Sequence, residues 1–203
     1  MRYRRSNHFP RPVGKLWLAM ALILLSACST DMPTRQSGFL SDYHHLSPMT
    51  VAGGQALKSD VPVDPAHITI TDIQWRVKDD HLTPTERNDL LNTLRSELQT
   101  QLNHLPANPG GRSADVRAAI TNVVTVSPSL NVLSTALIAA PLDRGGAAVE
   151  IEAIDSQTRQ QLAALNLGYY SPMSDIKARF SKLASARIAL DHASEDFGQL
   201  LRP

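Results

Sequence analysis

The first 28 residues constrain the folded part of this chain most. Their pattern predicts that residues 1–27 are cleaved off and do not belong to the fold. Five basic residues come first, with no acidic residue among them: Arg2, Arg4, Arg5, Arg11 and Lys15. An unbroken apolar run, Leu16–Leu25, follows and ends in small residues before Cys28. This order is typical of a secretory signal peptide. The apolar run is too short for a transmembrane helix, which needs about 20 residues.

The sequence Leu25-Ser26-Ala27-Cys28 resembles the cleavage site of bacterial lipoprotein signal peptides. The resemblance implies that Cys28 is lipidated and becomes the mature N-terminus. Cys28 is the only cysteine, so no intrachain disulfide competes for it. Two or more acyl chains hold a protein stably on a bilayer. Ser29 stands where aspartate would retain a lipoprotein in the inner membrane, so we expect an anchor in the outer membrane and a domain on its periplasmic face.

Composition limits what the mature chain can be. Removing 27 of the 203 residues leaves 176, which suits one domain with a substantial core. The removed segment carries five positive charges, so the formal net charge falls from +1 to −4. Nucleic acid is therefore not an expected partner, because phosphate binding needs clustered Lys and Arg. We expect a signal peptide at 1–27, a lipidated cysteine and polar tether at 28–36, and a single domain at 37–203.

The middle of the chain has the clearest secondary-structure patterns. The segment His67–Val77 reads as a strand whose apolar face changes near Asp72, which predicts a bulge or a strand buried on both faces. Thr83-Pro84-Thr85-Glu86 predicts a helix that begins with a capping box. A leucine stripe follows in this helix: Leu90, Leu91, Leu94, Leu98 and Leu102.

Three further strands and a second helix are expected. The strands are Asp115–Val126, Ala148–Asp155 and Gln161–Leu167, and the helix is Ser171–Leu201. Residues 37–46 have apolar residues at helical spacing, and we expect them to dock on the domain as a short helix or turn. Residues 47–66 are expected to be mostly loop. Residues 128–146 are expected to form either a helix or a buried extended segment. The order predicts an α+β fold with a single small mixed or antiparallel sheet of about four strands and two amphipathic helices packed on it.

Four segments resemble the DUF3313 family of bacterial lipoproteins, a family defined by a domain of unknown function. They are SGFLSDY (37–43), SLNVLST (129–135), GGAAVEIEAIDSQT (145–158) and the final amphipathic helix. The family has no assigned catalytic residues, so the resemblance implies none here. One departure is Arg159, which stands where the family's D-S-x-T turn continues with glycine.

The densest acidic cluster is Glu150, Glu152 and Asp155. Glu150 and Glu152 must point to the same face of their strand. Two neighbouring carboxylates are suited to binding a divalent cation or to acid–base chemistry, although a solvated strand face is the more common reason for such a pair. We therefore treat the three as a candidate ligand-binding site. No cofactor and no defined metal site follows from the sequence.

The sequence contains no G-x-S-x-G, H-E-x-x-H, S-x-x-K or phosphate-binding glycine motif. A non-catalytic module of the cell envelope is the favoured hypothesis, with the membrane as one partner through Cys28 and an envelope protein as another. Such a module predicts an apolar or aromatic patch outside the core. The alternatives are a small-molecule or divalent-metal-binding periplasmic domain, possibly hydrolytic, and a structural lipoprotein that touches peptidoglycan.

Overall fold

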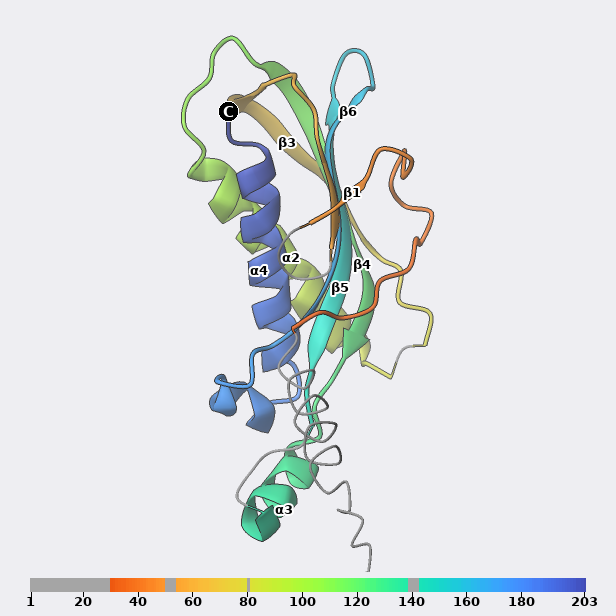
Figure 1. The fold of residues 1–203 in the computed structure, drawn as a ribbon, viewed down its shortest axis with the longest axis vertical. Coiled ribbons are helices and arrows are strands. Elements are labelled where there is room, and N and C mark those ends of the chain that lie inside the picture. Colours follow the sequence, from red (N-terminus) through yellow and green to blue (C-terminus); the bar gives the residue numbers. More distant parts are fainter. Residues whose placement is uncertain (1–29, 50–53, 80, 139–142) are drawn as a thin grey trace, which may run out of the picture.

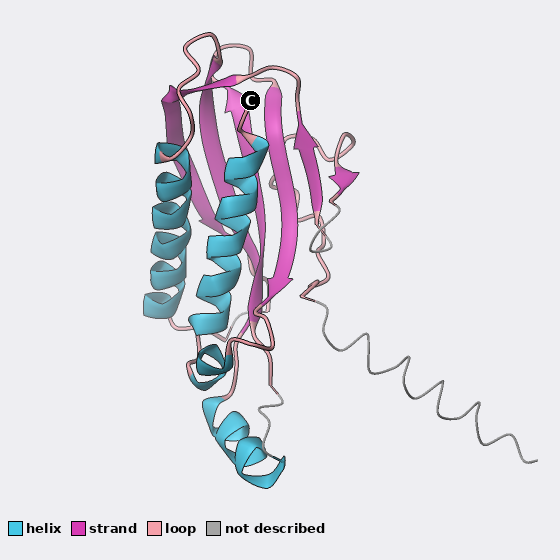
Figure 2. Cartoon of the chain, turned by 60° about the vertical axis from the view of Figure 1, so that its left-hand side comes forward, coloured by secondary structure: helices cyan, strands magenta, loops and turns pink. Residues whose placement is uncertain are grey.

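The computed structural model describes residues 30–49, 54–79, 81–138 and 143–203. The predicted signal peptide (1–27) and the predicted lipidation site Cys28 lie outside the described residues. Two long helices cover one face of a curved sheet, and the N-terminal segment crosses the other face (Figure 1). Figure 2 shows the two helices side by side on the sheet, with a third helix projecting from one end. No helix within the described ranges is long and apolar enough to cross a membrane.

The sheet has six strands in the order β1-β2-β6-β5-β4-β3. The strands are β1 (Ser47–Pro48), β2 (Gln55–Lys58), β3 (Val63–Trp75), β4 (Arg112–Val124), β5 (Gly146–Asp155) and β6 (Gln161–Tyr170). The helices are α2 (Pro84–Asn103), α3 (Pro128–Ile138), the 3-10 helix η2 (Ile176–Phe180) and α4 (Ala184–Leu200). β3 and β4 are parallel and joined through α2, whereas all other neighbours are antiparallel.

The α+β class and the mixed sheet are confirmed, but the expected four strands and two helices were too few. The error lies in residues 47–66, read as loop, which contain β1, β2 and the start of β3. β2 is four residues long and pairs with β6, more than 100 residues away. Its local sequence carries little strand signal, because strand formation depends on the partner more than on intrinsic preference.

The predictions are correct for elements that a local sequence pattern specifies. Thr83 caps α2, and its side chain and that of Glu86 form the predicted capping box. Four leucines of the stripe are buried against the sheet and α4: Leu90, Leu94, Leu98 and Leu102. The bulge in β3 also falls where predicted, since the register with β4 shifts between Ile70 and Asp72.

The C-terminal helix is shorter than predicted. The segment Ser171–Leu201 divides into η2 and α4, with a break at residues 181–183. The apolar stripe on which the longer helix was based does not continue through the break, because Ile176 and Phe180 are exposed while Arg179 is buried. The open question at residues 128–146 is resolved as a helix over Pro128–Ile138.

The β5–β6 hairpin turns on a residue with a left-handed backbone. Arg159 has φ of 62°, the only non-glycine residue with positive φ in the part of the chain that the structure describes. This conformation costs an L-residue about 1–2 kcal/mol, whereas glycine adopts it freely. The glycine that the family resemblance leads one to expect at this position is therefore explained by backbone geometry. The arginine side chain forms an exposed ion pair with Asp115 at 2.7 Å.

We expect Arg159→Gly to have a higher free energy of unfolding than Arg159→Ala, by about 1 kcal/mol. Both variants lose the ion pair with Asp115, so the comparison isolates the backbone. Urea denaturation of the two variants measures the difference. Equal midpoints would show that the turn tolerates a side chain at positive φ without cost.

Candidate functional site

Glu150 and Glu152 lie on the sheet face that the long helices do not cover. Alternate residues of β5 face the helical core, including Val149 and Ile151, so the two glutamates point the other way. Both are 0% exposed. The solvated strand face that the sequence left open is therefore not what forms. Residues 37–43 cover the two carboxylates, together with the small apolar cluster that Phe39 and Leu40 make against the sheet.

Glu150 accepts hydrogen bonds from three donors of this covering segment. The Ser37 backbone N–H donates to Oε1 at 2.8 Å, and the Ser37 hydroxyl donates to Oε2. The Tyr43 hydroxyl donates to Oε2 at 2.8 Å. These contacts satisfy a carboxylate whose burial would otherwise be costly. These three donors to Glu150 are neutral groups, so hydrogen bonds provide its stabilisation.

Tyr43 organises the turn that carries it. Its hydroxyl oxygen accepts hydrogen bonds from the backbone N–H groups of Gly38, Phe39 and Leu40, at 2.9 to 3.1 Å. Burial raises the pKa of the Tyr43 hydroxyl, and the hydrogen bond to Glu150 raises it further. The hydroxyl thus remains protonated and joins three backbone donors to a buried carboxylate.

Glu152 is held by charge as well as by hydrogen bonds. The Ser41 backbone N–H and hydroxyl donate to it, and the Gln161 side chain donates at 2.6 Å. The Arg117 guanidinium forms an ion pair with the same carboxylate. Arg117 also donates to the Phe39 carbonyl at 3.0 Å and lies over the Phe39 ring, 5.0 Å from its centroid. Arg117 therefore links the covering segment to the sheet, because it binds Glu152 of β5 and also the carbonyl and ring of Phe39.

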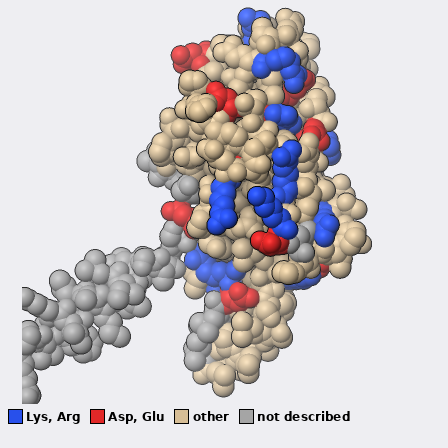
Figure 3. Space-filling view, turned by 90° about the vertical axis from the view of Figure 1, so that its right-hand side faces the viewer, with Lys and Arg blue, Asp and Glu red and all other residues tan. Residues whose placement is uncertain are grey.

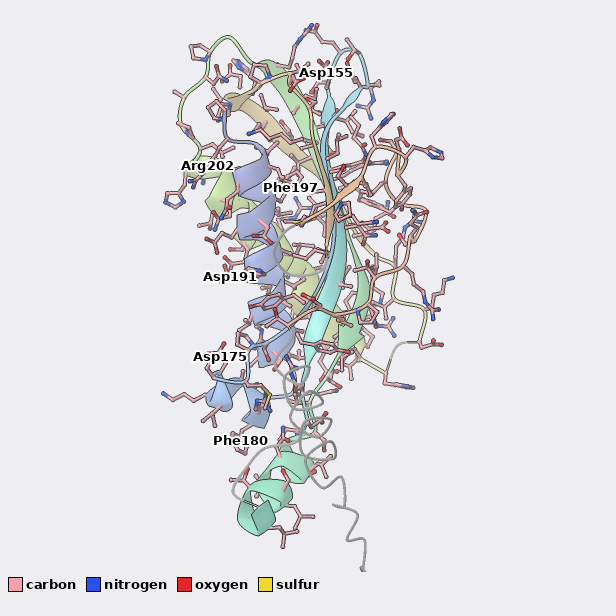
Figure 4. All side chains as sticks on the ribbon, viewed as in Figure 1. Asp155, Asp175, Phe180, Asp191, Phe197 and Arg202 are labelled. Carbon is pink, nitrogen blue, oxygen red and sulfur yellow. The ribbon has the colours of Figure 1, made fainter. Side chains whose placement is uncertain are left out.

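Asp155, the third predicted residue, lies apart from the glutamates in the hairpin turn. Its Oδ1 accepts the backbone N–H groups of Gln157 and Thr158, both at 2.8 Å. These bonds, led by that of Thr158, lower the pKa of the Asp155 carboxyl. Asp155 is thus a turn residue, far from the end of the molecule where Phe180 lies (Figure 4).

The structure brings together two of the three candidate ligands, Glu150 and Glu152, and gives both of them protein partners. Within the described ranges, no group of three or more His, Cys, Asp or Glu side chains is arranged to hold a metal ion. Ligand binding by these residues stays a hypothesis.

The expected tether at residues 28–36 is packed against the sheet where the structure describes it. The Met32 backbone N–H donates to the Gly168 carbonyl at 3.0 Å, and the Met32 side chain is buried. Asp31 pairs with Tyr169 as an isolated bridge. The Tyr170 backbone N–H donates to the Thr30 carbonyl at 2.7 Å. The chain is thus fixed at the end of β6 two residues after Cys28.

An apolar surface lies at this same end of the molecule. Among the described residues, the most exposed large apolar side chains all belong to α3 and the segment around η2, which contact each other. We call this surface the apolar end; it consists of Leu130, Val132, Leu133, Leu137, Met173, Ile176 and Phe180. Burying one such side chain fully is worth about 1.5–3 kcal/mol. Exposed apolar side chains gathered on neighbouring elements are typical of an interaction surface.

The polarity of α3 is inverted with respect to an ordinary surface helix. Its polar residues Asn131 and Ser134 are buried, whereas Leu137 is 74% exposed. The Asn131 side chain donates to the Arg179 carbonyl at 2.7 Å and accepts the Asp143 backbone N–H at 2.8 Å. These bonds hold α3 with its apolar side outward.

A basic cleft of about 440 Å³ adjoins the fixed N-terminal segment. Its lining includes Arg35, Arg76, Lys78 and Tyr170. Tyr170 also lies beneath the Arg144 guanidinium, whose carbon is 5.3 Å from the ring centroid. In Figure 3, Lys and Arg side chains gather on the sheet face, and this view shows few charged side chains at the lower end of the molecule.

The apolar end was not predicted from the sequence, although one sequence feature marks it. Residues 118–142 contain no charged side chain, and α3 lies within this run. An uncharged stretch is consistent with a buried core segment as well as with an exposed apolar surface. Only the burial of Asn131 and Ser134 distinguishes the two, and that depends on tertiary contacts.

The fold and the site together define an α+β domain with a mixed sheet and a fastened N-terminal segment. The family model for DUF3313, described as a protein of unknown function, matches residues 35–197. The chain therefore belongs to the DUF3313 family. The matched range includes the covering segment, the acidic pair and the apolar end.

Comparison with solved structures gives loose similarities. One is to a PelC dodecamer from Paraburkholderia phytofirmans, with 9% identity and a TM-score of 0.42, covering 73% of this chain and 98% of that one. Another is to a dodecamer of a PelC variant from the same organism, with 10% identity and a TM-score of 0.40, covering 71% and 97%. A search of curated proteins found no match.

We expect Tyr43→Phe to lower the free energy of unfolding by about 1–3 kcal/mol, because buried donors and a carboxylate lose their shared partner. Tyr170→Phe is the matched control, since the interaction described for Tyr170 involves its ring. Chemical denaturation of both variants measures the effect. Equal stability of the two variants would show that the Tyr43 hydroxyl does not hold the segment.

Proposed function

We propose that this protein is a lipoprotein of the bacterial outer membrane, anchored by Cys28, whose domain is a non-catalytic interaction module on the periplasmic side. The observation that carries the proposal is the apolar end, where α3 presents Leu133 and Leu137 outward and buries Asn131. A helix with this inverted polarity exposes apolar side chains to water, and such exposure is typical of a surface that a partner covers. The expected partner is a component of the envelope.

The engagement of the acidic pair supports a non-catalytic role. A general acid or base must have an oxygen free to meet a substrate. Glu150 and Glu152 instead bind Ser37, Tyr43 and Ser41 of the same chain. Their role in the fold is to fasten the segment that follows the anchor, and this arrangement favours binding over catalysis.

A photo-reactive amino acid in place of Leu137 tests the interaction module in living cells. We expect irradiation to join position 137 to an envelope component, either protein or lipid, which mass spectrometry of the purified adduct identifies. Gln157 is the matched control, because it is exposed in the hairpin turn at the other end of the domain. Equal adducts at both positions, or none at position 137, would contradict the proposal.

The anchor is tested in the same cells. Incorporated palmitate and outer-membrane density on a sucrose gradient are expected for the unaltered chain, and both should be lost in Cys28→Ser. Palmitate at inner-membrane density would contradict the outer-membrane location while keeping the anchor.

A second candidate is a small-molecule or divalent-cation site at Glu150, Glu152 and Asp155. In its favour, two carboxylates share one face of β5. A ligand would have to displace Ser37 and Ser41, so we expect calcium, magnesium and zinc to leave the melting temperature unchanged. A rise with one of these ions that disappears in Glu150→Gln would favour this candidate, because a ligand that binds the folded state stabilises it.

A further inference from the structure

The path of the N-terminal segment fixes which end of the domain faces the anchor. Thr30 is hydrogen-bonded to Tyr170 at the end of β6. Two peptide units separate Thr30 from Cys28, a span of at most about 7 Å. A lipid on Cys28 therefore emerges beside the end of β6 and cannot reach the opposite end of the domain.

The apolar end is connected to this point through a short series of direct contacts. The Ser171 backbone N–H, next to Tyr170, donates to the Gly145 carbonyl at 3.0 Å. Two residues before Gly145, Asp143 is bonded to Asn131 of α3. η2 begins five residues after Ser171. The point where the described chain begins, red in Figure 1, therefore lies in the same half of the molecule as α3.

We propose that the apolar end is a membrane-docking surface that inserts into the bilayer interface beside the lipid anchor. The proposal rests on the proposed function, since it takes Cys28 as lipidated. Two features select a bilayer as the occupant. The surface is joined through a few residues to the point from which the chain leads to Cys28, and its helix α3 carries no charged residue that insertion would have to desolvate. In the neighbouring η2, the exposed Lys177 has a long side chain that can extend to the headgroups.

Basic side chains near the apolar end also favour a bilayer as the partner of this surface. The basic cleft with Arg35, Arg76 and Lys78 opens beside the fixed N-terminal segment. Basic groups at the level of the headgroups are attracted to anionic lipids. Apolar side chains in the bilayer, with cations above them at the phosphates, form the usual layering of a protein that lies on a membrane. Docking would turn a flexible attachment through acyl chains into a fixed orientation of the domain.

A depth-sensitive probe tests the proposal on the full lipidated chain. Lipidation consumes the only native cysteine, so Leu137→Cys provides a single free thiol for an environment-sensitive fluorophore. Leu137 is 74% exposed, so the substitution leaves the core intact. The labelled protein is reconstituted into vesicles of phosphatidylethanolamine and phosphatidylglycerol, with or without lipids carrying a spin-label quencher at a shallow acyl position.

We expect the probe at position 137 to shift to shorter wavelength and to be quenched several-fold more strongly than a probe on Gln157→Cys. Ile176→Cys, from the neighbouring segment, should behave like Leu137→Cys. A water-like probe at positions 137 and 176 would overturn the proposal. A shifted probe that the spin-labelled lipid does not quench would overturn it too, and would indicate a second copy of the chain or another protein on this surface.

Failure of docking is distinguishable from failure of the anchor. Co-flotation with vesicles and the mass of the lipidated N-terminal peptide report the anchor alone. A protein that floats but keeps position 137 in water contradicts docking and leaves the proposed function standing. An unmodified Cys28 contradicts the proposed function itself.

Discussion

The burial of two carboxylates under residues 37–43 is the interaction on which the arrangement of this domain depends. Glu150 and Glu152 would strongly destabilise the sheet without partners, since buried carboxylates need hydrogen bonds or opposite charge. The N-terminal segment supplies those partners from Ser37, Ser41 and Tyr43. Its docking therefore stabilises the sheet, and the sheet fixes its path. The consequence reaches beyond the two glutamates, because the same path places Thr30 at the end of β6.

Elements with a local pattern were predictable from the sequence. The capping box at Thr83 and the leucine stripe define α2 without any tertiary information. The strands of the β5–β6 hairpin follow from alternation and a turn signal, and the bulge near Asp72 follows from a change of phase. In each case the residues that specify the element lie within about one turn or one strand pair of each other, so propensity and patterning agree with the fold.

Features that depend on distant partners were not predictable. β2 forms because β6 presents an edge to it, and β1 pairs in turn with β2. The sequences of both strands contain little that distinguishes them from loop. The alternation of β5 places Glu150 and Glu152 on one face. Whether that face is exposed to solvent or buried depends on a segment more than 100 residues away in the sequence. The docking of residues 37–46 was expected from the spacing of Phe39, Leu40 and Tyr43 and is confirmed, while its link to the acidic pair appears only in three dimensions.

Docking on a bilayer would account both for the exposed apolar end and for the attachment of the N-terminal segment to the sheet. A long free tether would allow the domain to tumble, so an apolar helix at one end would face water for most orientations. A chain fixed from Thr30 onward leaves only Ser29 between the fold and Cys28. With a lipid on Cys28, confining the domain this closely would raise the effective concentration of α3 at the membrane surface, so that even a small apolar patch would be held there. In a domain docked as proposed, the buried acidic pair would therefore determine which side chains meet the bilayer, although it lies remote from it.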